Sequence, residues 1–242
     1  MTVQELSNQF DVLVSSYRRF KDFDNKELLD SIEFNEYEKS LYLTKAQEEL
    51  VLSLYNGRNS SLQGFEETEE LRRYLSNLVE EAKLEPIVTS DGKPLGIESN
   101  SKFFTLPEDL WFLTYESALL GQGKCEGHTS QDVYPVTQDE YNKVKKNPFR
   151  GANFRRALRL DLSENNIEVI SKYEVTGYYV RYIKKLQPIV LVDMPNGITV
   201  GGVGIATECQ LHDSLHQRIL EMAVEMAMRS KVGSTSKQED NN

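Results

Sequence analysis

The spacing of apolar residues changes near Pro86, and this change limits what the chain can fold into. Before Pro86, apolar residues recur every three or four positions, which is the period of one face of a helix. After Pro86, short runs of aromatic and β-branched residues are separated by turn residues, a pattern typical of strands. The sequence therefore predicts an α+β fold, with N-terminal helices followed by a β-rich middle region.

Apolar stripes predict the helices of the first 86 residues. The first stripe comprises Val3, Leu6, Phe10, Leu13, Val14 and Tyr17. Thr44 with Gln47 has the pattern of a capping box, and predicts a helix that ends near Asn56-Gly57, where glycine can take the left-handed cap conformation. Residues 26–34 are a shorter helical candidate. A later stripe predicts a helix that ends before Pro86 and contains Leu71, Tyr74, Leu75, Leu78 and Ala82.

Aromatic and β-branched runs predict the strands of the middle region. These runs cover residues 103–106, 110–119, 155–161, 167–175 and 178–193. In the last run, Tyr178, Val180 and Tyr182 are expected to share one face of the sheet, because side chains alternate along a strand. Asp91-Gly92 is a candidate hairpin turn. A short helix is predicted at 137–146, capped by Thr137 and ended before Pro148.

A final apolar stripe predicts a C-terminal helix that packs on the N-terminal helices and completes a bundle. Ser214 with Gln217 has the capping-box pattern, and the helix is expected to end near Lys231. Its stripe comprises Leu215, Ile219, Met222, Ala223 and Met226. The expected parts are a helical part of the bundle, a β-rich region with a basic arm at 142–160, the C-terminal bundle helix and a disordered tail. They cover residues 1–86, 87–205, 206–231 and 232–242.

Charge is distributed unevenly along the chain. Residues 1–85 contain 18 acidic and 10 basic residues. The basic arm contains no acidic residue and seven basic ones, Lys143, Lys145, Lys146, Arg150, Arg155, Arg156 and Arg159. The formal net charge of −10 argues against a surface that wraps nucleic acid, because neutralising phosphates needs an excess of Lys and Arg.

The basic arm is the candidate partner-binding site, and its aromatic residues suit more than one partner. It could contact the phosphates and stack on the bases of a nucleic-acid strand. It could also dock on an acidic surface of another copy of the chain, which we favour because both charge blocks are then used. A solvated basic loop is the third possibility. The proposed contact residues are Lys143, Lys145, Lys146, Phe149, Arg150, Arg155 and Arg156.

Two Cys/His pairs are the candidate metal ligands. Cys125 with His128 and Cys209 with His212 could together supply a tetrahedral zinc set, as in a zinc-dependent hydrolase. The two pairs lie 84 residues apart and no further ligand spacing supports them. Coincidence is therefore the favoured interpretation, and no metal or cofactor is predicted.

The remaining motifs give no catalytic site. Residues 212–216 (HDSLH) are similar to the HExxH metalloprotease pattern, but Asp is one methylene shorter than the general-base Glu. The glycines of residues 200–204 do not form a phosphate-binding loop before a helix, and predict a turn-rich hairpin instead. A non-enzymatic protein is therefore predicted. No apolar run approaches the length of a membrane span, so a soluble protein is expected.

Longer strings of the sequence resemble a neck protein of crAss-like bacteriophages. LTKAQEELV (43–51) and FEETEELRRYLSNLV (65–79) resemble its N-terminal helices. Three later strings follow in the same order: PVTQDEYNKVKKNPFRG (135–151), YYVRYIKKLQPIVLVDMP (178–195) and ATECQLHDSLHQRILEMAVEMAMRSK (206–231). The resemblance covers most of residues 35–231.

The resemblance implies a ring-forming head–tail connector, similar to the adaptor of short-tailed phages. Such a protein forms a homo-oligomeric ring, expected to be a dodecamer, in the neck of the virion. It binds the portal protein and the next tail or neck ring protein, and leaves a channel for the viral double-stranded DNA. The chain would be made in the host cytoplasm. The family pattern contains no catalytic residues. An acidic channel would let DNA pass without specific binding, because carboxylates repel phosphates.

Overall fold

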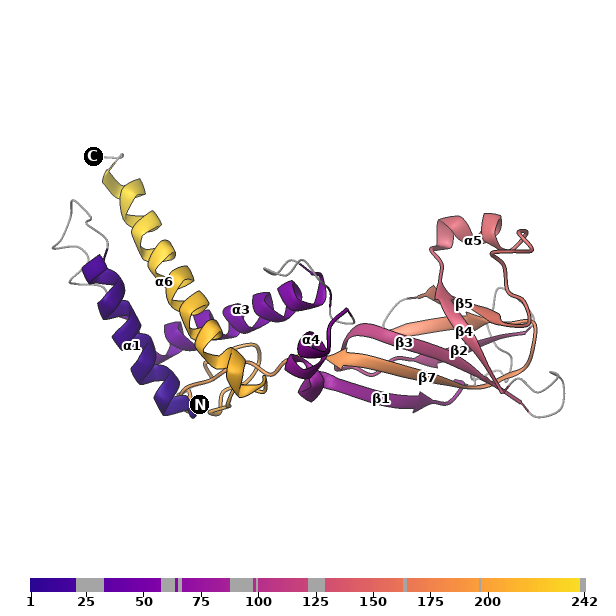
Figure 1. Ribbon diagram of the computed structural model, residues 1–242, viewed down its shortest axis with the longest axis horizontal. Helices are drawn as coiled ribbons and strands as arrows, with labels where there is room; N and C mark the ends of the chain where they lie inside the picture. The colour runs from indigo at the N-terminus through magenta and orange to yellow at the C-terminus, as the bar shows by residue number, and fades with distance from the viewer. Residues whose placement is uncertain are drawn as a thin grey trace. The chain divides into compact units, whose positions relative to one another are not determined.

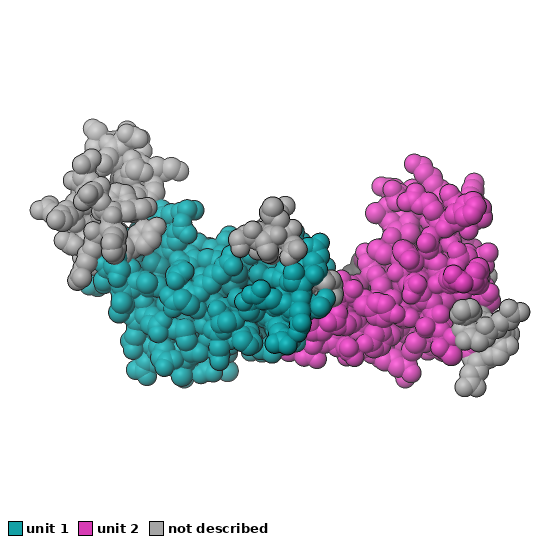
Figure 2. Space-filling model, in the orientation of Figure 1, with its two compact units in different colours: residues 1–78, 186–242 teal, residues 79–185 magenta. Residues whose placement is uncertain are grey.

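The computed structural model contains two compact units, residues 1–78 with 186–242 and residues 79–185 (Figure 2). It describes residues 1–20, 33–57, 64, 67–87, 98, 100–121, 129–162, 165–195 and 197–239, without the side chains of 17–20 and 232–239. Helices lie towards both ends of the chain and strands in the middle, so the predicted α+β class is confirmed. No helix in these described ranges is long and apolar enough to cross a bilayer.

The helical unit is built on α1 (Val3–Phe20), α3 (Glu36–Tyr55) and α6 (His216–Glu239), with α1 and α3 both packed against α6 (Figure 1). The predicted stripes form its core. In α1, Leu6 and Phe10 are fully buried, as are Ile219 and Ala223 in α6. The buried Lys39 of α3 joins α3 to α1, because its Nζ donates to a carboxylate oxygen of Asp11 at 2.7 Å.

The start of α3 differs from the sequence-based prediction. The capping box is formed by Asn35 and Glu38, and Thr44 lies in the interior of the helix. The end of α3 is as predicted, since Gly57 follows it with a φ of 68°. The apolar residues of Thr44–Tyr55 continue a stripe that starts earlier in the helix. Thr44 has the sequence pattern of a cap, but its hydroxyl accepts a hydrogen bond from the backbone of Ile189 instead.

The next predicted helix is replaced by three shorter elements. They are α4 (Glu69–Tyr74), the 3₁₀ turn η1 (Ser76–Leu78) and strand β1 (Val79–Leu84), which contains Ala82. Leu71, Leu75 and Leu78 are buried as expected. The stripe therefore identified the buried residues correctly, but the helical period was wrong beyond Tyr74, where pairing in a sheet overrides local propensity.

The C-terminal helix also begins and ends differently from the prediction. A 3₁₀ turn, η2 (Asp213–Leu215), precedes α6 and is capped by His212, whereas Ser214 was the predicted cap. The helical backbone continues past Lys231 to Glu239 in the segment predicted to be a disordered tail. The isolated Gly233 is tolerated because glycine costs a helix only about 1 kcal/mol. The candidate helix at 26–34 and the candidate turn at Asp91-Gly92 fall wholly or mainly outside the described residues.

The second unit is a seven-stranded sheet in the order β1-β7-β3-β4-β5-β6-β2. Its other strands are β2 (Ser101–Thr105), β3 (Leu110–Leu120), β4 (Ser130–Pro135), β5 (Arg156–Asp161), β6 (Asn166–Ile170) and β7 (Val175–Lys184). Neighbouring strands are antiparallel except β4 and β5, which run parallel. Sequence patterns missed β1 and β4, and the predicted last strand ends at Lys184 rather than at 193.

The sheet is curled, and its concave core draws on all seven strands. Ile87, just after β1 at one edge, forms an antiparallel bridge to Phe103 of β2 at the other edge. Tyr178, Val180 and Tyr182 belong to this core, which confirms their predicted common face. Alternation along β5 places Leu158 and Leu160 on the opposite, convex face, where the helix α5 (Gln138–Val144) covers them.

Candidate interaction surface

The basic arm is the connection between the two parallel strands. The chain leaves β4, forms α5 over the convex face and returns to β5 at Arg156 (Figure 1). Parallel neighbours cannot be joined by a tight turn, so a crossover of this kind is required. Tyr141 and Val144 of α5 pack against Leu158, Leu160 and Ile170 of the sheet. The arm is therefore anchored to a rigid base.

An Asn-centred turn shapes the tip of the arm. The Oδ1 atom of Asn147 accepts hydrogen bonds from the backbone N–H of Phe149 at 2.9 Å and of Arg150 at 3.2 Å. The N–H of Gly151 closes the turn onto the carbonyl of Asn147 at 2.8 Å. A Cβ at Gly151 would lie 2.8 Å from that carbonyl, so glycine is required here. The turn presents Phe149, which is 85% exposed.

A second Asn-centred turn leads from the tip into β5. Asn153 Oδ1 accepts from the backbone N–H of Arg155 at 2.9 Å and of Arg156 at 3.0 Å. The buried side chain of Gln131 on β4 ties this turn to the sheet, because its Nε2 donates to the Asn153 carbonyl at 2.7 Å. Ser171 donates in turn to Gln131 Oε1 at 2.6 Å. Both turns are thus held by side-chain amides.

Aromatic rings hold the two arginines of the second turn. The guanidinium of Arg156 lies 4.2 Å from the ring centroid of Tyr134, and its Nη1 donates to the Phe149 carbonyl at 2.9 Å. Arg155 lies 5.1 Å from the ring centroid of Phe154. Such contacts restrict a long side chain and leave its charge available to a partner.

The structure brings together the sequence-predicted contact residues on this arm. Exposed are Lys143, Lys145, Lys146, Phe149, Arg150 and Arg155, while Arg156 is half-buried. Arg159 does not belong to the surface. It lies on β5, is buried, and pairs with Glu116 at 2.8 Å and with Asp161 at 2.9 Å.

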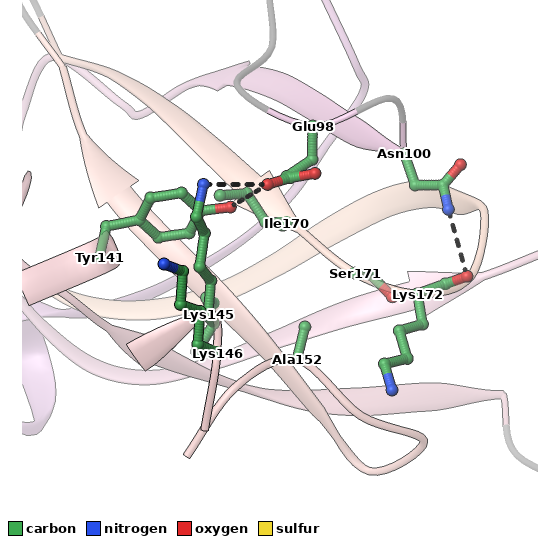
Figure 3. Close-up of a pocket in the computed structure, with 10 residues that line it drawn as sticks. Glu98, Asn100, Tyr141, Lys145, Lys146, Ala152, Ile170, Ser171 and Lys172 are labelled. Carbon is green, nitrogen blue, oxygen red and sulfur yellow. Dashed lines mark hydrogen bonds and ion pairs between the residues drawn. The ribbon is translucent and has the colours of Figure 1, made fainter. Parts of the chain in front are cut away.

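A pocket of about 400 Å³ lies beside α5 (Figure 3). Lys145, Lys146 and Lys172 contribute to its lining, together with Tyr141 and Glu98. Glu98 accepts a hydrogen bond from the Tyr141 hydroxyl at 3.0 Å and lies 3.7 Å from Lys145 Nζ. Burial and the neighbouring Glu98 raise the pKa of Tyr141, so its hydroxyl stays protonated. A carboxylate thus accompanies the basic arm in space, although none is present in its sequence.

The comparisons with known proteins assign the chain to a family. The model of the phage tail ring protein 3/4 family matches residues 1–239. The chain belongs to this family. It is 43% identical over 242 residues to ring protein 3 of Bacteroides phage crAss001, with 99% of this chain and the whole relative covered. It is 28% identical over 242 residues to ring protein 4/5 of the same phage, with 96% of this chain and 94% of the relative covered. The resemblance to a ring protein of crAss-like phages is thereby confirmed.

Two candidate zinc ligands of this ring-family chain, Cys209 and His212, have other contacts. Cys209 Sγ donates to Gln47 Oε1 at 3.2 Å, and burial raises the pKa of its thiol to about 11. His212 Nδ1 accepts from the backbone N–H of Ser214 at 3.3 Å and so caps η2. No cluster of metal-ligating side chains is present among the residues that the structure describes. Cys125 and His128 lie outside those residues.

The HDSLH motif and the glycine-rich stretch are both structural in this chain. His216 is buried and contacts the Leu211 carbonyl through Nε2 at 3.0 Å. Val200 and Val203 exchange backbone hydrogen bonds of 2.9 and 3.0 Å, with Gly201 and Gly202 at φ of 56° and 87° between them. Two positive φ values define a tight hairpin turn, as predicted.

A polar row on α3, which the sequence patterns did not predict, positions the distant segment 187–191. Ser40 Oγ accepts from the Leu191 N–H at 3.1 Å, and Thr44 Oγ1 from the Ile189 N–H at 3.1 Å. Gln47 Nε2 donates to the Gln187 carbonyl at 2.9 Å. The polar row therefore satisfies the backbone of an extended segment laid along the helix. Spacing of three and four between these polar residues was the available signal.

A buried ionic cluster inside the curled sheet was also missed. Arg159 Nη1 donates to both carboxylate oxygens of Glu116 at 2.8 Å, and the Tyr178 hydroxyl donates to the same carboxylate. Burial raises the pKa of Glu116, and Arg159 and Tyr178 oppose this shift. The cluster satisfies charges that face the concave core. The position of Arg159 between Leu158 and Leu160 on an alternating strand was the signal.

Proposed function

We propose that this chain is a structural protein that forms a homo-oligomeric ring, a dodecamer, in the neck of a phage virion. The ring joins the portal to the next tail or neck ring and leaves a channel for the genome. The observation that carries the proposal is the match of the tail ring protein family to residues 1–239. Two relatives named as ring proteins match over almost the whole chain.

The basic arm is the proposed contact with a neighbouring subunit or with the next ring. Exposed cations precede and follow Phe149 in the sequence of the arm, and its two Asn-centred turns fix its shape before binding. A prearranged surface binds more tightly because less conformational entropy is lost on association. A central aromatic residue with a charged rim is also the usual composition of an interface hot spot.

The acidic excess of the chain favours passage of DNA through the ring without tight binding. A net charge of −10 repels phosphates and offers duplex DNA no strong binding site. Genome passage requires weak contact, because several kcal/mol of binding at each subunit would slow ejection. Tight, sequence-independent DNA binding by an isolated ring would contradict this part of the proposal.

Electron cryomicroscopy of virions, and of the chain co-expressed with the portal protein, tests the ring. We expect density for this chain in a ring beneath the portal, with a central channel. Co-expression matters because a connector ring can require the portal as a template. Density for the chain elsewhere in the virion, or its absence from the neck, would overturn the proposal.

Charge reversal tests the basic arm as an assembly contact. In the double variant Arg155→Glu, Arg156→Glu, we expect ring yield at physiological salt to fall at least tenfold, since two attractive pairs per interface become repulsive. Lys45→Glu on α3 is the matched control, because Lys45 is an exposed cation in the helical unit. An intact ring in the double variant would contradict an arm-mediated contact.

A nucleic-acid-binding module is the second candidate function. It is favoured by the exposed Phe149 and by arginines placed against aromatic rings, which suit stacking with single-stranded bases. Filter binding of a single-stranded oligonucleotide over a range of salt concentrations separates the two functions. Affinity that falls steeply with salt and is lost in Phe149→Ala would support the module, and the ring protein is expected to show neither.

A further inference from the structure

A second exposed apolar surface lies on the helical unit, on hairpin 190–207. This hairpin is closed by the antiparallel bridge between Val190 and Thr207. Val192 and Ile205 each lie two residues beyond that bridge, and they are 42% and 68% exposed. Ile198, near the tip, is 46% exposed. Three exposed aliphatic side chains on one short hairpin exceed the scattered exposure that is normal for a protein surface.

The hairpin is rigid for a surface segment. The polar row of α3 fixes its first strand through Leu191 and Ile189, and its tight turn fixes the tip. Asp193 Oδ1 accepts from the N–H of Ala206 at 2.8 Å and ties the two strands together. The exposed aliphatic side chains are therefore held in place before any partner binds, as Phe149 is on the basic arm.

The charges of the two surfaces are complementary. Residues 186–211 contain two charged side chains, Asp193 and Glu208, and both are acidic and exposed. The tip of the basic arm, residues 142–156, contains six basic residues and no acidic one. An aliphatic surface with an acidic rim thus matches an aromatic residue with a basic rim.

We propose that hairpin 190–207 of one copy of the chain receives Phe149 and the basic arm of a neighbouring copy. The inference rests on the proposed function, because it names the two surfaces that meet in the ring. The surfaces are different regions of the same chain, so the contact is heterologous. Repeating a heterologous contact builds a closed ring when the rotation between subunits closes.

Intermolecular disulfide trapping in the assembled ring tests this contact. Phe149→Cys is placed in one chain and Ile205→Cys in a second chain, both in a Cys125→Ser background, and the two are co-assembled. Cys209 stays in place because it is half-buried, its Sγ is hydrogen-bonded to Gln47, and its thiol pKa of about 11 keeps it protonated. We expect a covalent dimer on a non-reducing gel, since a disulfide needs the two Cα atoms within about 7 Å.

Val12 supplies the matched control. It is an aliphatic residue of α1 with 64% exposure, close to that of Ile205. We expect at least tenfold less dimer when Val12→Cys replaces Ile205→Cys. Equal yields for the two pairs in intact rings would overturn the inference and leave the ring itself standing. Wild-type chains that form no ring when they are co-expressed with the portal protein would overturn the proposed function, and the inference with it.

A charge swap gives a second, independent measurement. Arg155→Glu and Glu208→Lys are each expected to reduce ring yield about tenfold, and the double variant is expected to recover it. Glu208 is suitable because it is exposed. Circular dichroism of each single variant confirms that it is folded. Failure of the folded double variant to recover assembly would count against the pairing of these two surfaces.

Discussion

The basic arm and hairpin 190–207 reach the same result, a rigid exposed surface, by different means. The arm is held mainly by its own residues, since Asn147 and Asn153 bond to backbone groups two and three positions away. The hairpin is held mainly by α3, whose polar row lies about 140 to 150 positions away in the sequence. Local hydrogen bonds shape the turns of the arm, which the sheet then anchors through Gln131, whereas the position of the hairpin depends mainly on α3.

Because the two surfaces lie in different units, a mutation in either one should change the stability of its own unit. The single tryptophan, Trp111, lies in the sheet unit, and most helix lies in the other unit. Tryptophan fluorescence therefore follows the unit that carries the arm, and circular dichroism at 222 nm mainly follows the unit that carries the hairpin. Denaturation monitored by both signals distinguishes the two effects.

The largest effect is expected for Gln47→Ala. The Gln47 side chain is fully buried, donates to the Gln187 carbonyl and accepts from Cys209. Its removal takes away the donor to the Gln187 carbonyl and leaves a cavity in the core, which costs about 2–3 kcal/mol. We expect the free energy of unfolding to fall by this amount in urea denaturation followed by circular dichroism. Glu48→Ala, exposed on the same helix, should change it by less than about 0.5 kcal/mol. Equal losses in the two variants would contradict a special role for the polar row.

Gly151→Ala is expected to have the next largest effect, in the arm. The added Cβ would lie 2.8 Å from the Asn147 carbonyl and 3.1 Å from the Val144 carbonyl. Relief of this overlap should cost about 1–2 kcal/mol, seen in the fluorescence transition. Gly204→Ala in the hairpin is the control, because its Cβ would meet the Ile198 carbonyl at an ordinary 3.4 Å. A neutral Gly151→Ala would show that the arm turn is softer than its geometry indicates.

Asn147→Ala should cost less, about 1 kcal/mol, because two partly exposed backbone N–H groups lose an acceptor but can bond to water. Asn147→Asp retains an acceptor oxygen and should restore most of the loss. The comparison is made on the fluorescence transition. If Asp behaves like Ala, the Oδ1 atom is not what stabilises the turn.

The smallest effect is expected for Cys209→Ser. A thiol is a weak donor, and a serine hydroxyl can make the same bond to Gln47, so stability should change by less than about 0.5 kcal/mol. Below its pKa of about 11 the half-buried native thiol stays protonated, so Cys209 should react with Ellman's reagent much more slowly in the native state than on unfolding. Rapid reaction in the native state would mean that the hairpin opens away from α3.

The sequence predicted the elements whose signals are local. Stripes on α1 and α6 were correct, because helix packing repeats every three or four residues. The turn at Gly201-Gly202 was also predicted correctly, because the positive φ values of a tight turn favour glycine at those two positions. Thr44 was misread because a polar residue inside a helix can serve either a cap or a distant backbone, and spacing alone does not separate the two. Strands β1 and β4 were missed because their sequences, VEEAKL and SQDVYP, lack long β-branched runs.

The candidate site was predictable in composition but not in geometry. Charge identified the arm, and six of its seven predicted contact residues are exposed. It did not identify Glu98, which joins the arm from a distant part of the chain. Charge also did not distinguish Arg159 from the exposed cations of the arm, although Arg159 is buried and paired with Glu116 in the sheet. Hairpin 190–207 carries no cluster of charge, and its exposed aliphatic residues look like core residues until the fold places them on the surface.

The parallel pairing of β4 with β5 has a consequence for how the arm can change during evolution. Pairing places Asp132 beside Arg156 and Pro135 beside Arg159, so the sheet fixes where the connecting segment 136–155 begins and ends, whatever that segment contains. The sheet requires from this segment only the apolar face of α5 and the tie to Gln131. The other residues of segment 136–155 can therefore change without disturbing the sheet. Two ring proteins of one virion could in this way bind different neighbours through different arms on the same fold.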